Sequence, residues 1–372
     1  MACGPQPIHR LRAGPDVQSG MVAESQPGAT RRRAAGDPWR SLPVSFSARF
    51  ARGGTRRTRG FGACMSVKVC IVGCGAIGSI FGAHLARLAD VEVHAYDVSK
   101  EHVSAINERG LRISGAEDFT ARLHATEDSS QIPVCDFGIV ATKSTHTRPA
   151  IEQTKHIFGP SSAVCSVQNG VGNEEILAEH VKYVIRGTTF PAGRVIEPGH
   201  VGFDISGDTW IGPFEPANTP YQFVERLSDL LNRSGLHVIP LKDARGAQWT
   251  KLIFNASTNP VGALTLLHHR AATHLPPTGA LFNDLIAEGE AVAKALGIEL
   301  HGDPRALVEK GASAPGKHNA SMLQDVLAKR QTEVDFMNGA IVEWGKKIGV
   351  PTPLNRAMWQ LIKGLEHSWT DP

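Results

Sequence analysis

The sequence predicts an α/β protein, in which a mostly parallel sheet covered by helices is followed by an all-helical part. Three observations predict this fold class. Between residues 67 and 243, short apolar runs alternate with amphipathic stretches of helical period. A glycine-rich turn joins the first of these runs to the first helical stretch. After Ala244 the strand-like runs vanish and long helical periods dominate, so we predict one domain over 65–244 and a second over 245–372.

The elements of the first domain follow from apolar runs and turn signals. The predicted strands are 67–73, 91–96, 137–142, 162–167, 183–190, 194–213 and 236–240. The predicted helices are 76–88, 99–109, 145–158, 173–181 and 218–233. Pro198-Gly199 indicates a hairpin turn inside the long segment 194–213. In the second domain, apolar residues recur at helical spacing from Leu281 to Leu296 and from Met322 to Ile348.

Residues 1–64 differ from the rest of the chain. They contain 11 Arg, no Lys and three acidic residues, and they show no apolar periodicity. A segment of this composition cannot bury a core, so we expect it to be disordered. Met65 directly precedes the first predicted strand, which favours Met65 as the natural first residue and residues 1–64 as a wrongly assigned extension. A transit segment and a genuine disordered tail are the alternatives.

The composition of the remaining chain narrows the function classes. Residues 65–372 hold 28 Lys and Arg against 33 Asp and Glu, so no basic stripe for nucleic acid is expected. No apolar run approaches the roughly 18 residues that a membrane-spanning helix requires. Six cysteines without metal-ligand spacing indicate a reducing compartment, so we expect a cytoplasmic protein without a metal site. A homodimer is among the oligomeric states left open.

A dinucleotide site is predicted where the first strand meets the first helix. The turn reads Gly73-Cys74-Gly75-Ala76-Ile77-Gly78, which is the Gly-x-Gly-x-x-Gly pattern. Gly73 makes the tight turn, Gly75 lets the backbone approach a pyrophosphate, and Gly78 lets the helix pack on the strand. The second strand ends at Asp97, about 20 residues further on, where a carboxylate can bind the ribose. A strand–turn–helix unit without a ligand is the alternative.

One face of a predicted helix in the second domain carries polar residues. Lys251, Asn255 and Asn259 are spaced by four and share that face. Burial between apolar neighbours can tune such a lysine to act as a general acid. A solvated lysine on an ordinary helix surface is the alternative. Pro260 disfavours the α conformation at Asn259, so we expect the helix to end or kink there.

Further polar candidates follow two predicted strands and lie near the C-terminus. Lys143 follows strand 137–142 and Gln168-Asn169-Gly170 follows strand 162–167. Both lie at carboxyl ends of strands, where open α/β sheets bind ligands, although Asn169-Gly170 is also a common tight turn. Ser321 and Glu333 belong to a polar region whose charges mostly suit a helix surface, and Ser321 can equally be an N-cap.

Residues 67–370 resemble ketopantoate reductase (2-dehydropantoate 2-reductase). The resemblance rests on the glycine motif, Lys143, Gln168-Asn169-Gly170, the pattern Trp249-x-Lys251-x-x-x-Asn255-x-x-x-Asn259-Pro260, and Ser321-Met322-Leu323-Gln324-Asp325 with Arg330-x-Thr332-Glu333. It implies a Rossmann domain joined to a helical domain like that of 6-phosphogluconate dehydrogenase. It also implies reduction of a small 2-oxo acid to a D-hydroxy acid with NADPH, on the route to pantothenate and coenzyme A.

The resemblance implies a role for each polar candidate. Lys251 is expected to donate the proton to the ketone oxygen. Asn255, Asn259 and Ser321 are expected to bind the substrate, with Ser321 at its carboxylate. Asn169 and Glu333 are expected to contact the cofactor, and Lys143 to lie close to its nicotinamide ribose.

Three departures from the family pattern leave alternatives open. NADPH-specific members commonly place an Arg after the second strand, whereas this chain has Asp97 with Lys100 nearby, which favours NADH. The segments 266–270 and 318–320 also depart, so a reductase for another 2-oxo acid or related carbonyl is the alternative. A non-catalytic dinucleotide sensor is a remote one, since a sensor has no need of the Lys251–Asn255–Asn259 face.

Overall fold

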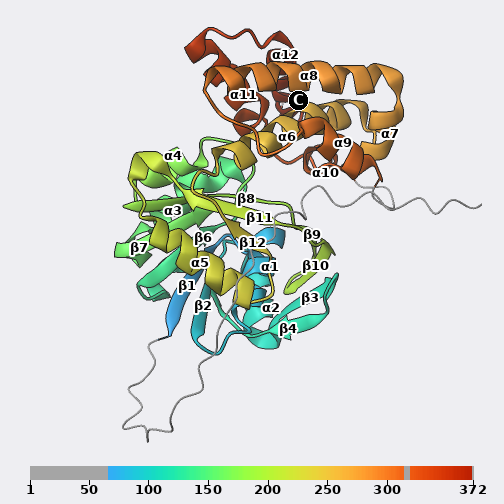
Figure 1. Ribbon diagram of the computed structural model, residues 1–372. Helices are drawn as coiled ribbons and strands as arrows, with labels where there is room; N and C mark the ends of the chain where they lie inside the picture. Colours follow the sequence, from blue (N-terminus) through green and yellow to red (C-terminus); the bar gives the residue numbers. More distant parts are fainter. Residues whose placement is uncertain (1–65, 314–318, 371–372) are drawn as a thin grey trace, which may run out of the picture. The chain divides into compact units, whose positions relative to one another are not determined.

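A computed structural model of the protein describes residues 66–313 and 319–370. The predictions for residues 1–64 and for a start at Met65 lie outside these residues. Two architectures follow one another along the described chain (Figure 1). Strands and helices alternate up to β12 (Val238–Pro240), and from α6 (Arg245–Thr265) onward every element is helical.

The main sheet has eight strands in the order β12-β11-β8-β7-β6-β1-β2-β5. Besides β12 these are β1 (Val67–Val72), β2 (Val91–Tyr96), β5 (His124–Thr126), β6 (Cys135–Val140), β7 (Phe158–Ser166), β8 (Tyr183–Thr189) and β11 (Thr209–Pro213). All pairs are parallel except β8 with β11. The run from β5 to β8 has the 3-2-1-4-5-6 order of a Rossmann sheet, whose switch point falls between β1 and β6.

Helices cover both faces of this sheet. They are α1 (Ala76–Leu85), α2 (Lys100–Arg109), α3 (Thr147–Thr154), α4 (Asn173–Ala178) and α5 (Tyr221–Arg233), with 3₁₀ turns at 129–131, 144–146, 155–157 and 215–217. Side chains of β1 alternate between two apolar cores, as the period of a strand requires. Val69 and Ile71 pack in the core that includes residues of α1 and α5, whereas Cys70 and Val72 pack in the core that includes residues of α3 and α4. The predicted fold class of this domain is confirmed.

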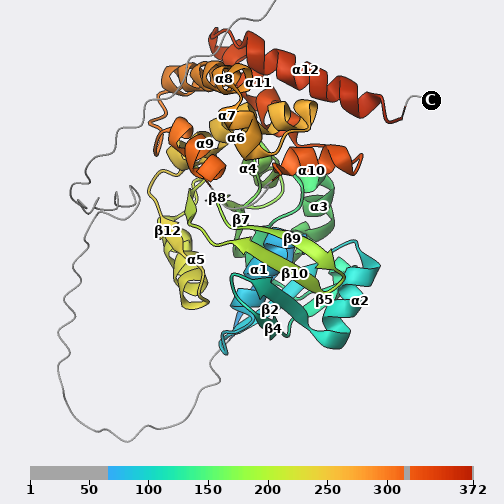
Figure 2. The same cartoon turned by 90° about the vertical axis from the view of Figure 1, so that its right-hand side faces the viewer.

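A second, four-stranded sheet was not predicted. Its order is β4-β3-β10-β9, from β3 (Leu111–Gly115), β4 (Phe119–Ala121), β9 (Ala192–Glu197) and β10 (His200–Ile205). In Figure 2, β9 and β10 lie side by side, and both contact α1. The hairpin at Pro198-Gly199 is confirmed, with Gly199 at φ +77°. The short strands between 111 and 126 escaped prediction because runs of three to five residues carry too little period to stand out.

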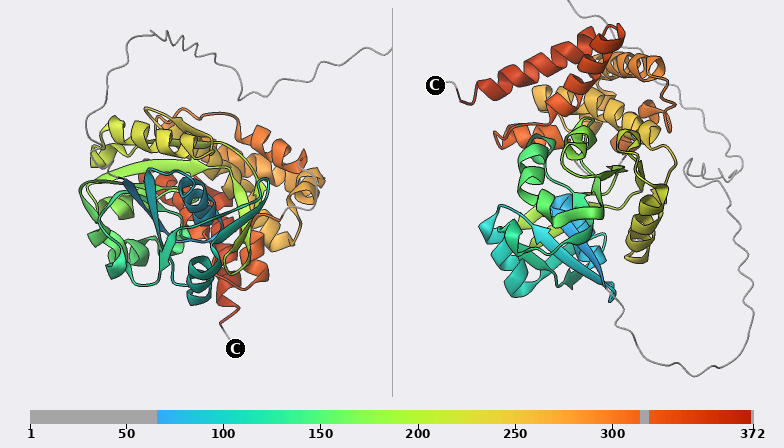
Figure 3. Two further views of the ribbon diagram at one scale, coloured as in Figure 1. Left: turned by 90° about the horizontal axis from the view of Figure 1, so that it is seen from below. Right: turned by 90° about the vertical axis from the view of Figure 1, so that its left-hand side faces the viewer.

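The C-terminal part is built from helices alone, drawn from yellow-orange to red in Figure 3. After α6 come α7 (His269–His274), α8 (Pro276–Ala295), α9 (Pro304–Ser313), α10 (Ser321–Leu327), a 3₁₀ turn at 334–336, α11 (Asn338–Ile348) and α12 (Pro353–His367). Their apolar faces form one core around α6, α8 and α11. Among residues 66–313 and 319–370, no helix is both long enough and apolar enough to cross a membrane.

Of the two possibilities predicted at Asn259, an end or a kink of the helix, the end is wrong. The helix continues through Pro260 to Thr265. A proline inside a helix removes the hydrogen bond to the carbonyl four residues earlier, at a cost of about 3 kcal/mol. Here that carbonyl, on Ala256, accepts a hydrogen bond from the buried side chain of Asn338 instead, at 2.8 Å. The substitute donor comes from α11, so a sequence window around Pro260 cannot reveal it.

Candidate active site

The glycine motif forms the turn from β1 into α1 as predicted. Gly73 has φ +89°, and a Cβ there would lie 2.5 Å from the side chain of Thr142, so this turn lies against the chain that follows β6. A Cβ on Gly78 would lie 1.9 Å from the carbonyl oxygen of Gly73. A Cβ on Gly75, in contrast, would meet no atom within 4 Å. Gly75 also forms the N-cap of α1 without any side-chain cap, so the helix start is open to an anion.

Asp97 follows β2 and lies against this turn. Its Oδ2 accepts a hydrogen bond from the backbone N–H of Cys74 at 2.7 Å, and its Oδ1 accepts one from Ser99 N at 2.9 Å. Lys100 pairs with Glu127 at 3.7 Å, with the lysine side chain 79 % exposed. The region beyond β2 therefore holds two carboxylates, Asp97 and Glu127, and the ammonium group of Lys100 pairs with Glu127.

Lys143 and Asn169 follow β6 and β7, and Glu333 from the helical part reaches both strand ends. Glu333 Oε1 accepts hydrogen bonds from Ser144 N at 2.9 Å and Ser144 Oγ at 3.0 Å. Its Oε2 accepts a hydrogen bond from Asn169 Nδ2 at 3.4 Å and lies 3.7 Å from Lys143 Nζ. Lys143 also donates to Asp325 Oδ2 at 2.6 Å. These residues, far apart in sequence, thus form one polar cluster at the carboxyl edge of the sheet.

Lys251 approaches the same edge from α6. Its ammonium group donates a hydrogen bond to the carbonyl of Thr189, the last residue of β8, and lies 5.3 Å from the centroid of the Phe190 ring. Burial lowers the pKa of Lys251 to about 8, while the negative charge of Glu333 opposes this shift. The interpretation of Lys251 as an ordinary solvated lysine does not fit this partly buried position.

The three other predicted substrate residues lie on or beside α6. Asn255 and Asn259 are buried and continue the face that begins with Lys251, because the helix is uninterrupted. Asn259 Nδ2 donates to the sulfur of Met337 at 3.7 Å. Ser321 is the first residue of α10, a helix that packs on α6. Its alternative role as an N-cap is wrong, since Ala320 holds that position.

Sequence reasoning missed several residues that the structure adds to this region. Ser144, Thr189 and Phe190 were overlooked, and Asp325 was noted only as part of a motif. Thr189 and Phe190 had a usable signal, because they end the predicted strand 183–190 at the same edge as Lys143 and Asn169. The described residues include no group of three or more His, Cys, Asp or Glu side chains that could hold a metal ion.

Comparison with known proteins agrees with this fold. The family model described as ketopantoate reductase PanE/ApbA matches residues 69–216, and the model of its C-terminal domain matches residues 243–366. The chain belongs to the ketopantoate reductase family. The resemblance drawn from the motifs is thereby confirmed, and with it the Rossmann-type dinucleotide-binding class.

Relatives in this family align with this chain over nearly their whole length. The 2-dehydropantoate 2-reductase of Pyrococcus abyssi is 34 % identical over 303 residues, which cover 81 % of this chain and 98 % of the relative. That of Archaeoglobus fulgidus is 30 % identical, with 80 % and 98 % covered.

Two solved structures share the fold over a similar share of the chain. A PanE/ApbA family ketopantoate reductase from Ralstonia eutropha JMP134 has a TM-score of 0.74 and 30 % identity, and covers 82 % of this chain and 100 % of its own. A ternary structure of D-mandelate dehydrogenase with NADH and anilino(oxo)acetate has a TM-score of 0.75 and 26 % identity, with the same coverage.

Proposed function

We propose that this protein reduces the ketone of 2-dehydropantoate to the hydroxyl group of (R)-pantoate with NAD(P)H. One observation carries the proposal beyond family membership. Lys251, with a pKa of about 8, lies at the carboxyl edge of β8, under the electrostatic influence of Glu333, which itself contacts the ends of β6 and β7. The residue that we expect to donate the proton and those that we expect to bind the dinucleotide therefore lie at one edge of the sheet. A sensor that only binds does not require this arrangement.

The residues present fit a dinucleotide. The open space at Gly75 and the uncapped start of α1 suit a pyrophosphate, and Asp97 suits the adenosine ribose. Lys143, Asn169 and Glu333 would hold the nicotinamide end. Bound NAD(P)H supplies the hydride that adds to the 2-oxo carbon.

The chain's own part in the chemistry falls to Lys251 and its helix face. Its ammonium group donates a proton to the ketone oxygen as negative charge develops there, and its positive charge stabilises that oxygen. The buried amides of Asn255 and Asn259 orient the substrate, and the Ser321 hydroxyl donates to its carboxylate.

A steady-state screen tests the function directly. The purified protein should reduce 2-dehydropantoate with a kcat/KM higher than for other small 2-oxo acids, measured with NADH and with NADPH. A chain that binds dinucleotide but turns over no 2-oxo acid would support the sensor instead.

A second candidate function is reduction of a 2-oxo acid with a large apolar or aromatic side chain. The observation that favours it is the Phe190 ring, which lies beside the Lys251 ammonium group. The Trp210 ring packs edge-to-face against Phe190, with 5.4 Å between the ring centroids. Such a ring can pack against an aryl group held at the proton donor. The likeness to D-mandelate dehydrogenase bound to anilino(oxo)acetate agrees with it. Preference for phenylglyoxylate over 2-dehydropantoate in the same screen would select this candidate.

The cofactor preference that we propose is NADH at least as good as NADPH. The 2′-phosphate of NADPH would meet Asp97 and Glu127, and Lys100 is already paired with Glu127. Ribose hydroxyls can instead donate to the Asp97 carboxylate. Family resemblance favours NADPH, whereas one structural neighbour carries NADH. Because these two indications differ, the proposal of NADH rests on the local charges around Asp97.

Replacing Asp97 should reverse this preference. The Asp97→Arg variant should shift the ratio of kcat/KM for NADPH over NADH by about tenfold or more, equivalent to about 1.4 kcal/mol, because a guanidinium can clamp the phosphate. Asp97→Asn serves as the control that removes the charge alone. Strong NADPH preference in the wild type would mean that another residue binds the phosphate.

The rate of reduction should fall as pH rises above about 8. Lys251 must be protonated to donate, and its depressed pKa of about 8 places the loss of that proton in this range. We therefore expect a descending limb of kcat centred near pH 8 for reduction, and the opposite slope for oxidation of the hydroxy acid. A flat kcat between pH 7 and 10 would contradict Lys251 as the donor.

A further inference from the structure

Gln248 lies one turn before Lys251 on α6 and makes three side-chain hydrogen bonds to other elements. Its Nε2 donates to the carbonyl of Gly170 at 3.2 Å and to Glu174 Oε1, on α4, at 2.8 Å. Its Oε1 accepts from Arg186 Nη1, on β8, at 2.5 Å. The side chains of Gln248, Glu174 and Arg186 are all nearly inaccessible to solvent, so these bonds face no competition from bulk water.

We propose that Gln248 is a positioning residue for the proton donor, and that its amide holds Lys251 in register with the loop that carries Asn169. The inference rests on the proposed function, because it takes Lys251 as the donor. Gln248 itself touches no reacting atom in this account.

Two successive hydrogen bonds join β8 to α6 and support a fixed position of the first turn of α6 along the end of β8. Arg186 and Thr189 are three residues apart on β8, and their partners Gln248 and Lys251 are three residues apart on α6. Residues at this spacing on a helix are neighbours on one face. A shift of the first turn of α6 would therefore move the Lys251 ammonium group along the end of β8.

The cofactor side is held through Gly170. This glycine directly follows Asn169 and has φ +85°, and a Cβ there would lie 2.3 Å from the carbonyl of Phe336. Val171 N also donates to that carbonyl at 3.0 Å. The loop is thus closely packed against Phe336 and hydrogen-bonded to Gln248, while Val171 packs in the same apolar core as residues of α6. The Gln248 amide is the polar link that ties the carbonyl of Gly170 to α6.

Glu174 makes this arrangement sensitive to pH. Its Oε2 is buried without a hydrogen-bond partner in the described structure, and burial raises the pKa of this carboxyl to about 7. The charged groups around it are Arg186 on β8, which lowers the pKa, and Glu175 on α4, which raises it; the Cys165 thiol of β7 also interacts with it. Gln248 is its neutral partner on α6. When Glu174 ionises, the bond from Gln248 becomes charge-assisted and about twice as strong, so the register should tighten as pH rises through 7.

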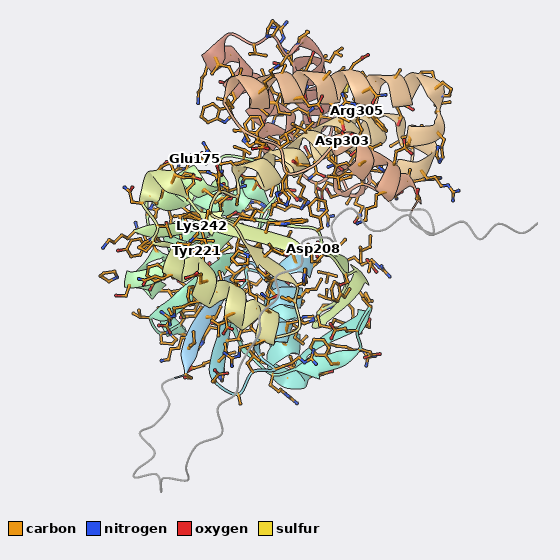
Figure 4. All side chains as sticks on the ribbon, in the orientation of Figure 1. Glu175, Asp208, Tyr221, Lys242, Asp303 and Arg305 are labelled. Carbon is orange, nitrogen blue, oxygen red and sulfur yellow. The ribbon has the colours of Figure 1, made fainter. Side chains whose placement is uncertain are left out.

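Two variants with matched controls test the inference. Gln248→Met keeps the length of the side chain but loses all three bonds, and Gln222→Met changes an exposed glutamine on α5. Glu174→Gln keeps the bond to Gln248 but cannot titrate, and Glu175→Gln changes its exposed neighbour, labelled in Figure 4. Thermal unfolding and dinucleotide titration establish that each variant is folded.

We expect folded Gln248→Met to lose about 10- to 100-fold in kcat, because a small misplacement of a catalytic group has effects of this size. The dissociation constant of the dinucleotide should change much less. In the wild type, kcat should rise through pH 7 and then fall near pH 8. Glu174→Gln should abolish that rise and Gln222→Met should leave it unchanged. Glu175→Gln should keep the rise but move it to lower pH, because Glu175 raises the pKa of Glu174.

An unchanged kcat in folded Gln248→Met, or a rise through pH 7 that persists in Glu174→Gln, overturns the inference. If Gln248→Met does not fold, the pH profile of Glu174→Gln decides alone. The proposed function has its own test, since it fails if the wild type binds dinucleotide but turns over no 2-oxo acid. Wild-type turnover in Lys251→Ala would instead exclude Lys251 as the proton donor. Loss of turnover in Lys251→Ala with normal kcat in Gln248→Met refutes the positioning role only.

Discussion

The Lys251→Ala variant should lose turnover by about 10²- to 10⁴-fold while it still binds dinucleotide, because general acid catalysis contributes rate factors of this size. Alanine removes the proton donor and the positive charge together. The glycine motif and Asp97 lie on other elements, β1, α1 and the end of β2, so their contacts are unaffected. Single-turnover kinetics with 2-dehydropantoate and fluorescence titration with NADH measure the two effects separately.

The matched control is Lys294→Ala, which removes an exposed lysine from α8 in the same helical part. It should retain wild-type kcat and the same unfolding temperature. Near-normal turnover in Lys251→Ala, with Lys294→Ala unaffected, would exclude Lys251 as the proton donor.

Two glycines of the motif should respond differently to alanine, one by loss of stability and the other by loss of dinucleotide affinity. At Gly78 a Cβ would lie 1.9 Å from the backbone oxygen of Gly73, which no side-chain rotation can relieve. We expect Gly78→Ala to destabilise the protein by about 3 kcal/mol or more, at the upper end of overpacking effects. At Gly75 the backbone is extended, with φ −67°, and the added methyl group meets no protein atom within 4 Å. Gly75→Ala should therefore fold normally but bind dinucleotide at least about tenfold more weakly, a loss of about 1.4 kcal/mol.

Denaturant unfolding and NADH titration of both variants check this contrast. Normal NADH affinity in Gly75→Ala would mean that the open space at Gly75 is not where the pyrophosphate binds. Unchanged stability in Gly78→Ala would contradict the close approach of α1 to the end of β1.

Much of the site could be predicted from local sequence, for a physical reason. Lys143 and Asn169 were found because each follows an apolar strand, and the carboxyl ends of parallel strands meet at one edge of the sheet. The face formed by Lys251, Asn255 and Asn259 follows from helical period alone. Glu333 could be selected only through family resemblance, since its hydrogen bond to Asn169 joins residues 164 positions apart.

Where local rules failed, a distant partner was responsible. Pro260 is a helix breaker by local rules, yet α6 continues because Asn338 bonds the carbonyl that the proline leaves free. The four-stranded sheet formed because β3 pairs with β10, whose residues lie far along the chain. The strands β3 and β4 are too short to be recognised alone, and pairing with the predicted hairpin of β9 and β10 makes them stable.

The sequence by itself determined the order of the longer elements of the first domain, the dinucleotide motif and the polar face of α6, because all three depend on residues that are close together along the chain. Only the tertiary structure decided that Glu333 reaches the ends of β6 and β7, that Gln248 bonds three elements, and that burial beside Thr189 and Phe190 lowers the pKa of Lys251. These properties depend on distance and solvent exclusion between segments far apart in sequence, and no local pattern encodes either quantity.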